Sequence, residues 1–141
     1  MTQEDKDLLL KDLCSRVPYR VKCKYDDRLI VNTLSVDFFW EKIEGYERYV
    51  NCTRKYDIEN IKPYLFPLSS MTVEQMCKVQ NLLPDNCDIS FKNQKITFYD
   101  EGNIQLEQLE KVFNFFNMHH IDYRGLIPMG LANDAPEGMY N

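Results

Sequence analysis

The stretch DISFKNQKITFY, residues 88–99, constrains the fold most, because one register satisfies every side-chain pair between its two halves. Apolar and polar side chains alternate along it, which is typical of a strand with one buried face. A two-residue loop at residues 93–94 sets apolar side chains opposite apolar ones and polar opposite polar. The stretch therefore predicts an antiparallel β-hairpin with one face against a core. Its pairs are Phe91 with Ile96, Ile89 with Phe98, and Ser90 with Thr97.

Three further segments carry the signals of amphipathic helices. Two begin with a capping box, in which a threonine and a side chain three residues later bind backbone N–H groups at the helix start. These boxes are Thr2 with Asp5, and Thr72 with Gln75. Apolar side chains then recur every three or four residues. We expect helices at residues 3–16, from Val73 to Pro84, and at residues 104–118, the last capped by Asn103.

Alternation also predicts strands in the first half of the chain. In residues 19–25, Val21 and Cys23 share one face, and basic side chains occupy the other. We expect a turn at residues 26–27 and two further strands, at residues 28–36 and 49–53.

The segment IKPYLFP, residues 61–67, contains two prolines, which a regular helix interior excludes. We therefore expect an irregular, aromatic-rich connection there. The elements run α-β-β-(β)-α-β-β-α, without strict βαβ alternation. The order predicts an α+β fold, a single compact domain over residues 1–141 with a mostly antiparallel sheet and about three helices packed on it.

Charge and composition exclude several classes of protein. The formal net charge is −5, whereas duplex DNA binders neutralise many phosphates with Lys and Arg. No stretch approaches the ~18 consecutive apolar residues of a membrane span, and the start MTQEDKDLLLKD is acidic where a signal peptide is basic. The five cysteines are an odd number without close pairs, so we expect buried, reduced thiols. These features predict a cytoplasmic protein that binds neither duplex nucleic acid nor membranes.

Residues 118–131, MHHIDYRGLIPMGL, form the densest group of functional side chains. Adjacent His119 and His120 diverge on a helix or a strand, so we expect no metal there. Arg124 followed by Gly125 sets a fork of N–H donors beside backbone that a ligand can approach closely, which suits a phosphate or carboxylate. The structural alternative is that Asp122 or a carbonyl of the preceding helix binds Arg124, and that Gly125 only permits a turn.

Other candidates are weighed in the same way. Aromatic rings in irregular segments, Tyr123 and Tyr64 among them, could stack on a base or belong to the core. The hydroxyls of Ser69, Ser70 and Thr72 precede a helix, where capping is their first role. A basic strand face is expected to be solvated, with an anionic partner as the alternative. It comprises Arg20, Lys22 and Lys24, with Arg16 and Arg28 nearby.

The blocks KPYLFPLSSMT and HHIDYRGLIPMGLANDAPEGMY resemble those of a family of short uncharacterised proteins from gut Bacteroidetes and their phages and prophages. The resemblance covers about half the chain and is strongest at the C-terminal block. Phe66 departs from the family pattern, where an arginine is common. The resemblance implies an accessory protein of a phage or mobile element that works in the bacterial host cytoplasm, and it implies no established activity.

The leading hypothesis is a non-catalytic, cofactor-free binding protein. It would sequester a small anionic, nucleotide-type immune signal with Arg124, Tyr123, His119, His120, Gly125 and Tyr64, in a pocket that a homo-oligomer could complete. A second hypothesis is a module that inhibits a host protein through residues 38–40 or 64–66. A third is a His-dependent hydrolase of such a signal, although GxSxG, GxGxxG and GxxxxGK motifs are absent from the sequence. We assign no catalytic residue.

Overall fold

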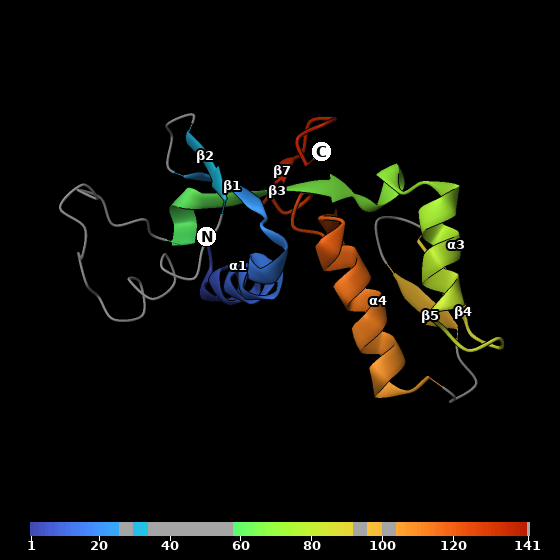
Figure 1. Cartoon of the computed structure of the whole chain (residues 1–141). Coiled ribbons are helices and arrows are strands. Elements are labelled where there is room, and N and C mark those ends of the chain that lie inside the picture. The colour runs from blue at the N-terminus through green and yellow to red at the C-terminus, as the bar shows by residue number, and fades with distance from the viewer. Residues whose placement is uncertain (26–29, 34–57, 92–95, 100–103, 141) are drawn as a thin grey trace.

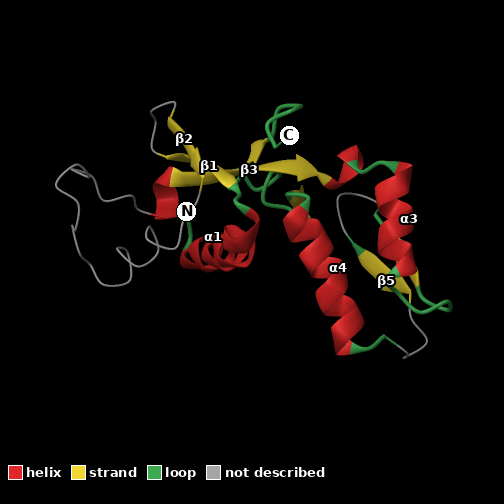
Figure 2. Cartoon of the chain, viewed as in Figure 1, coloured by secondary structure: helices red, strands yellow, loops and turns green. Residues whose placement is uncertain are grey.

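The computed structural model describes residues 1–25, 30–33, 58–91, 96–99 and 104–140, and Figure 1 shows their arrangement. This part of the chain holds the helices α1 (Gln3–Arg16), α3 (Val73–Asn81) and α4 (Leu106–Met118). The architecture is α+β with mostly antiparallel pairing, as the sequence predicts (Figure 2). The strands are β1 (Lys22–Tyr25), β2 (Ile30–Thr33), β3 (Ile61–Pro67), β4 (Asp88–Ser90), β5 (Thr97–Tyr99), β6 (Ile121–Asp122) and β7 (Asn133–Asp134).

The larger sheet is built around β3, which changes partner along its length. Residues 61–63 of β3 pair antiparallel with β1, and β1 pairs antiparallel with β2. The second half of β3 pairs in parallel, first with β7 and then with β6. Figure 1 shows α1 and α4 on the same side of β3. The strand β3 therefore connects the N-terminal elements to the C-terminal ones.

The existence of β3 contradicts the expectation of an irregular connection at residues 61–67. Proline lacks an N–H group, but its fixed φ is compatible with an extended chain. Pro63 is the last residue of β3 paired with β1, and Pro67 is the last paired with β6, so each proline stands where a ladder ends. Ile61, Pro63 and Leu65 are buried on one face. This alternation is the signal that the two prolines masked.

The predicted hairpin forms in the predicted register. Ile89 pairs with Phe98 and Ser90 pairs with Thr97 in the two-stranded sheet of β4 and β5. The loop at residues 93–94 lies outside the described residues, as do the turn at 26–27 and the strand expected at 49–53.

Both predicted capping boxes are confirmed. The N–H of Asp5 donates to Thr2 Oγ1 at 3.1 Å, and the N–H of Gln75 donates to Thr72 Oγ1 at 3.1 Å. The start predicted for the last helix is wrong, because Gln105, not Asn103, is the N-cap of α4. The N–H of Gln105 donates to the side chain of Gln108 at 2.8 Å, so the cap again joins residues three apart.

Two clusters of buried apolar side chains stabilise the fold, and the first of them combines residues from both ends of the chain. Val73 and Leu106 belong to neither, since each is the first residue of its helix and is about three-quarters exposed (76% and 73%). The first cluster lies around α1, β1 and β3 and contains Leu9, Leu13, Val21, Cys23, Ile61, Leu65, Leu126, Leu131 and Ala132. The second lies around α3 and α4 and contains Leu68, Met71, Val79, Leu83, Cys87, Val112, Phe115, Phe116 and Ile121.

Replacing the cap of α3 tests the local origin of this helix. Thr72→Ala removes the acceptor of the Gln75 N–H group and is expected to lower the free energy of unfolding by about 1 kcal/mol, measured by urea denaturation. Thr72→Ser keeps the acceptor and should stay close to the wild type. Equal stability of all three proteins would contradict the assigned role of the cap.

Candidate functional site

The backbone at the end of α4 turns two histidines toward β3. His119 caps the helix, and its N–H donates to the carbonyl of Phe115 at 3.1 Å. His120 takes a left-handed conformation with φ +57°, which is uncommon for a residue with a side chain. The carbonyl of His120 accepts the N–H of Phe66 at 2.8 Å, and Ile121 then pairs with Phe66. The turn therefore holds both histidines beside the end of β3.

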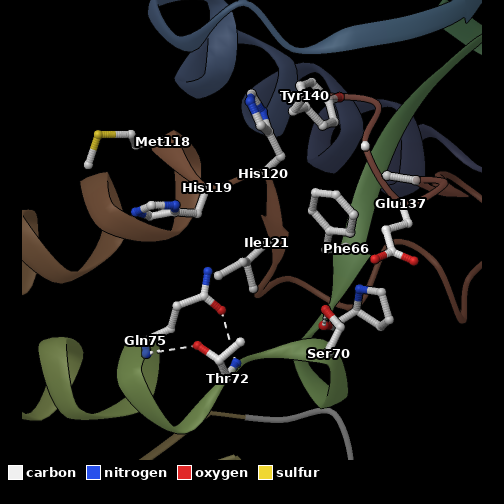
Figure 3. Close-up of a pocket in the computed structure, with 13 residues that line it drawn as sticks. Phe66, Ser70, Thr72, Gln75, Met118, His119, His120, Ile121, Glu137 and Tyr140 are labelled. Carbon is white, nitrogen blue, oxygen red and sulfur yellow. Dashed lines mark hydrogen bonds between the residues drawn. The ribbon is translucent and has the colours of Figure 1, made fainter.

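A pocket of about 580 Å³ lies where α4, the end of β3, the start of α3 and the C-terminal segment meet (Figure 3). Its volume is within the ~300–1,000 Å³ range of small-molecule sites. Figure 3 shows Thr72 and Gln75 on the α3 side, with Phe66 and Glu137 on the side of β3 and the C-terminal segment. The lining includes four rings and four polar side chains. The rings are those of Phe66, His119, His120 and Tyr140, and the polar side chains are those of Ser70, Thr72, Gln75 and Glu137.

The histidines of this pocket are held in the neutral form at pH 7. Burial, with a contribution from the charge of Lys78, lowers the pKa of His119. Burial lowers the pKa of His120 to about 4, and the nearby cations Arg16 and Lys22 add to the effect. Among the described residues that line the pocket, Glu137 is then the one with a formal charge. The lining favours groups that stack and form hydrogen bonds over groups that carry charge.

The hydroxyls of the pocket serve the backbone. Ser70 Oγ donates to the carbonyl of Pro67 at 2.7 Å, and Thr72 Oγ1 accepts the N–H of Gln75. The capping role predicted for Thr72 is thus confirmed. Each hydroxyl oxygen has two lone pairs, so these bonds still allow contact with a ligand.

Arg124 and Tyr123 do not line this pocket, and their side chains bind inside the protein. Arg124 Nε lies 3.1 Å from Asp12 Oδ1, and Arg124 Nη2 donates to Tyr123 Oη at 2.8 Å. The guanidinium carbon lies 4.9 Å from the centre of the Tyr123 ring. The side chain of Arg124 is 18% exposed. The pocket therefore includes His119 and His120 of the predicted ligand residues, and Arg124 and Tyr123 are partly buried side chains that pack around the buried Asp12 instead.

The centre of this cluster of side chains is Asp12, which also pairs with Arg16 on the same helix. Arg16 Nε donates to Asp12 Oδ2 at 2.8 Å, and Arg16 Nη2 donates to Oδ1 at 3.1 Å and to the carbonyl of Ile121 at 2.7 Å. Both side chains are fully buried. The assignment of Arg16 to a basic surface near β1 was therefore wrong. The signal for this pair was a carboxylate between Leu9 and Leu13, on the apolar face of a helix, with an arginine four residues later.

The segment DYRGLI, residues 122–127, folds as a turn that Asp122 closes. Its two carboxylate oxygens accept the N–H groups of Leu126 and Ile127, each at 2.8 Å. Gly125 has φ +75°, and a Cβ at that position would meet no atom within 4 Å, so its role is the turn itself. Arg124 is thus bound by Asp12 rather than by Asp122 or a helix carbonyl.

The remaining candidates have separate roles. Tyr64 is half-buried in β3, and its carbonyl accepts the hydroxyl of Tyr140 at 2.6 Å. Lys22 of the basic face donates to the carbonyl of Met139 at 2.7 Å. The expectation of buried thiols holds for two of the described cysteines and not for the other two. Cys23 and Cys87 are buried, and Cys14 and Cys77 are exposed.

Within the residues that the structure describes, His, Cys, Asp and Glu side chains nowhere gather in a group of three that could hold a metal ion. The described helices include none with the length and hydropathy of a membrane span. The chain matches no protein-family model, no curated protein and no solved structure. The function is therefore argued from the pocket and its surroundings.

Removing the charge of Asp12 should destabilise the protein strongly. Asp12→Asn keeps the size of the side chain but leaves Arg16 and Arg124 without their shared counter-charge, which costs about 3–5 kcal/mol in a buried cluster. Urea denaturation measures the loss, and Asp85→Asn, at an exposed position, is the matched control. A loss no larger than that of the control would contradict the buried cluster.

The neutral state of His120 predicts a pH dependence of stability. An unfolded histidine takes up a proton near pH 6.5, whereas His120 does so near pH 4 when folded. The contribution of neutral His120 to the free energy of unfolding is complete above pH 6.5. This contribution decreases by on the order of 3 kcal/mol as the pH falls toward 4. His120→Asn removes the titration and suits the left-handed backbone. Urea denaturation at several pH values between 4 and 6.5 gives the free energy of unfolding as a function of pH. This free energy should fall less steeply with falling pH in the variant than in the wild type, and an equal pH dependence of the two proteins would contradict the prediction.

Proposed function

We propose that this chain is a non-catalytic binding protein whose pocket takes a small molecule with a flat heteroaromatic group, such as the base of a nucleotide-type signal. The observation that carries the proposal is the pocket of about 580 Å³ lined by four rings and several hydrogen-bonding side chains. Stacking of a base on an aromatic ring contributes roughly 1–3 kcal/mol. Ser70, Thr72 and Gln75 can then distinguish the polar edge of the base.

The charges of the pocket favour the base over a phosphate as the bound group. Lysine and arginine are absent from its described lining, and both histidines are neutral at pH 7. The side chains that bind phosphate in proteins are usually Arg or Lys. We therefore propose that a nucleotide-type ligand keeps its phosphate outside the ring-lined part of the pocket.

The resemblance to proteins of gut Bacteroidetes phages supplies a biological setting for this proposal. A phage or mobile-element protein that captures a nucleotide-type signal in the host cytoplasm would weaken an immune response that depends on that signal. Such a protein needs affinity and abundance rather than turnover. The described pocket is formed within one chain, so a homo-oligomer is a separate prediction that light scattering after size-exclusion chromatography would test.

Two alternatives have less support in the described residues. An interaction patch at residues 64–66 could not use Leu65, which is fully buried, and Phe66 of this segment lines the pocket. Residues 38–40, the other proposed patch, lie outside the described part of the chain. A hydrolase needs a histidine paired with a nucleophile or a carboxylate. Among the described residues, the hydroxyls of Ser70, Thr72 and Tyr140 bind backbone groups rather than either histidine.

Thermal unfolding in the presence of adenosine, guanosine, cytidine, uridine and their monophosphates tests the proposal. We expect at least one nucleoside to raise the Tm, and its monophosphate to bind within about threefold of it by calorimetry, a difference below 1 kcal/mol. His119→Ala removes a pocket ring and should weaken that nucleoside roughly 5- to 100-fold. Leu106→Ala, at an exposed position outside the pocket, is the control.

Three outcomes would overturn parts of this proposal. No rise in Tm with any nucleoside or monophosphate would remove the proposed ligand class. Binding of monophosphates alone, abolished by Arg124→Ala and not by His119→Ala, would return the site to the turn at residues 122–127. Release of a cleaved product would replace sequestration with hydrolysis.

A further inference from the structure

One wall of the pocket is the C-terminal segment, residues 133–140. Its strand β7 pairs with Tyr64 and Leu65 of β3, and the N–H of Ala135 donates to the carbonyl of Leu65 at 2.8 Å. Beyond that bond the segment leaves the sheet and reaches the pocket. Four of its residues line the pocket, namely Ala135, Glu137, Gly138 and Tyr140. The shape of the pocket therefore depends on where this segment lies.

The hydroxyl of Tyr140 forms hydrogen bonds with both β1 and β3 and so holds the end of the segment beside them. It accepts the N–H of Lys22 at 3.0 Å and donates to the carbonyl of Tyr64 at 2.6 Å. The pairing of β1 with β3 ends at Cys23 and Pro63, one residue before this point. The hydroxyl thus connects the N–H of Lys22 with the carbonyl of Tyr64, the two backbone groups that come next after the last strand pair.

The ring of Tyr140 makes a second set of contacts on the pocket side. It stacks on His120 with centroids 3.6 Å apart and planes 17° apart, and it meets Phe66 edge-on at 5.9 Å. Lys22 Nζ also donates to the carbonyl of Met139 at 2.7 Å. Figure 3 shows Tyr140 and His120 next to each other above Phe66. One side chain therefore connects the segment to β1, to β3 and to the turn after α4.

We propose that Tyr140 is the positioning residue of the binding pocket, and that ligand binding and docking of the C-terminal segment stabilise each other. This inference rests on the proposed function, because it assigns the regulation of the same pocket. A ligand that touches the segment only when it is docked must favour the docked state, and the docked state must favour the ligand by the same factor. A docked segment presents Ala135, Glu137 and Gly138 to the ligand, whereas an undocked one leaves the pocket open on that side.

The ring and the hydroxyl of Tyr140 have effects that substitutions can separate. Tyr140→Phe keeps the stack on His120 and loses both hydrogen bonds to the strands. Tyr140→Ala loses both sets of contacts. Tyr99 is exposed and does not line the pocket, so Tyr99→Phe and Tyr99→Ala are matched controls for the loss of a hydroxyl and of a ring.

The experiment measures the dissociation constant of adenosine by NMR titration, at a temperature where circular dichroism shows every variant folded. We expect Tyr140→Phe to weaken adenosine severalfold and Tyr140→Ala at least about tenfold, with both Tyr99 variants unchanged. Hydrogen exchange at the amides of Lys22 and Ala135 reports docking of the segment. Exchange at both should slow when adenosine binds the wild type and speed up in Tyr140→Ala without ligand.

The pKa of His120 is a further readout, and a change in overall stability alone would not alter it. Without the ring of Tyr140 over it, the pKa of His120 should move from about 4 toward the ordinary value of a histidine, and Tyr140→Phe should restore the low value.

The outcomes separate this inference from the proposed function. Undiminished adenosine binding in Tyr140→Ala would overturn the inference and leave the proposed function standing. Exchange at Ala135 that is unaffected by adenosine would also overturn the coupling. A wild type that binds none of the four nucleosides would overturn the proposed function and this inference with it.

Discussion

The rest of the structure depends on one buried carboxylate. Asp12 neutralises Arg16 within α1 and pairs with Arg124 from the turn after β6, and Arg16 also binds the carbonyl of Ile121. These bonds join the two hydrophobic clusters, since α1 contributes to the first and Ile121 to the second. A buried charge is tolerated only when it is paired, so the cluster fixes where the C-terminal half of the chain meets α1. The position of the C-terminal half against α1 in turn sets where α4 ends, and the residues at that end line the pocket.

The pocket is made by segments that are far apart in the sequence and that meet at one end of β3. The left-handed turn at His120 directs the chain from α4 into β6, and Tyr140 returns from the C-terminus to stack on it. Arg124, a candidate anion-binding residue from the sequence, pairs with Asp12 inside the fold and does not line the pocket. The pocket is lined instead by rings, two of them histidines with lowered pKa values, and we propose that such a lining suits a flat, uncharged group.

Local signals in the sequence predicted the parts of the fold that depend on neighbouring residues. The capping box at Thr72 and the hairpin register that sets Ile89 opposite Phe98 are examples, because each involves residues close in the chain. The strand β3 was missed because the cost of a proline depends on where ladders end, which only the tertiary pairing decides. The ion pair of Arg124 with Asp12 and the hydrogen bond between Lys22 and Tyr140 each join residues more than 100 positions apart, so their spacing in the sequence does not indicate them. His119 and His120 were named as candidates from the sequence, and their place in a pocket with Phe66 and Tyr140 came from the fold.

Residue-resolved chemical-shift mapping of adenosine on the wild-type protein reports where a ligand binds without changing any side chain. We predict that the largest shifts fall on the backbone amides of Thr72, His119 and Gly138, which belong to three different walls of the pocket. Shifts confined to residues 122–127, or no shifts at millimolar nucleoside, would contradict it.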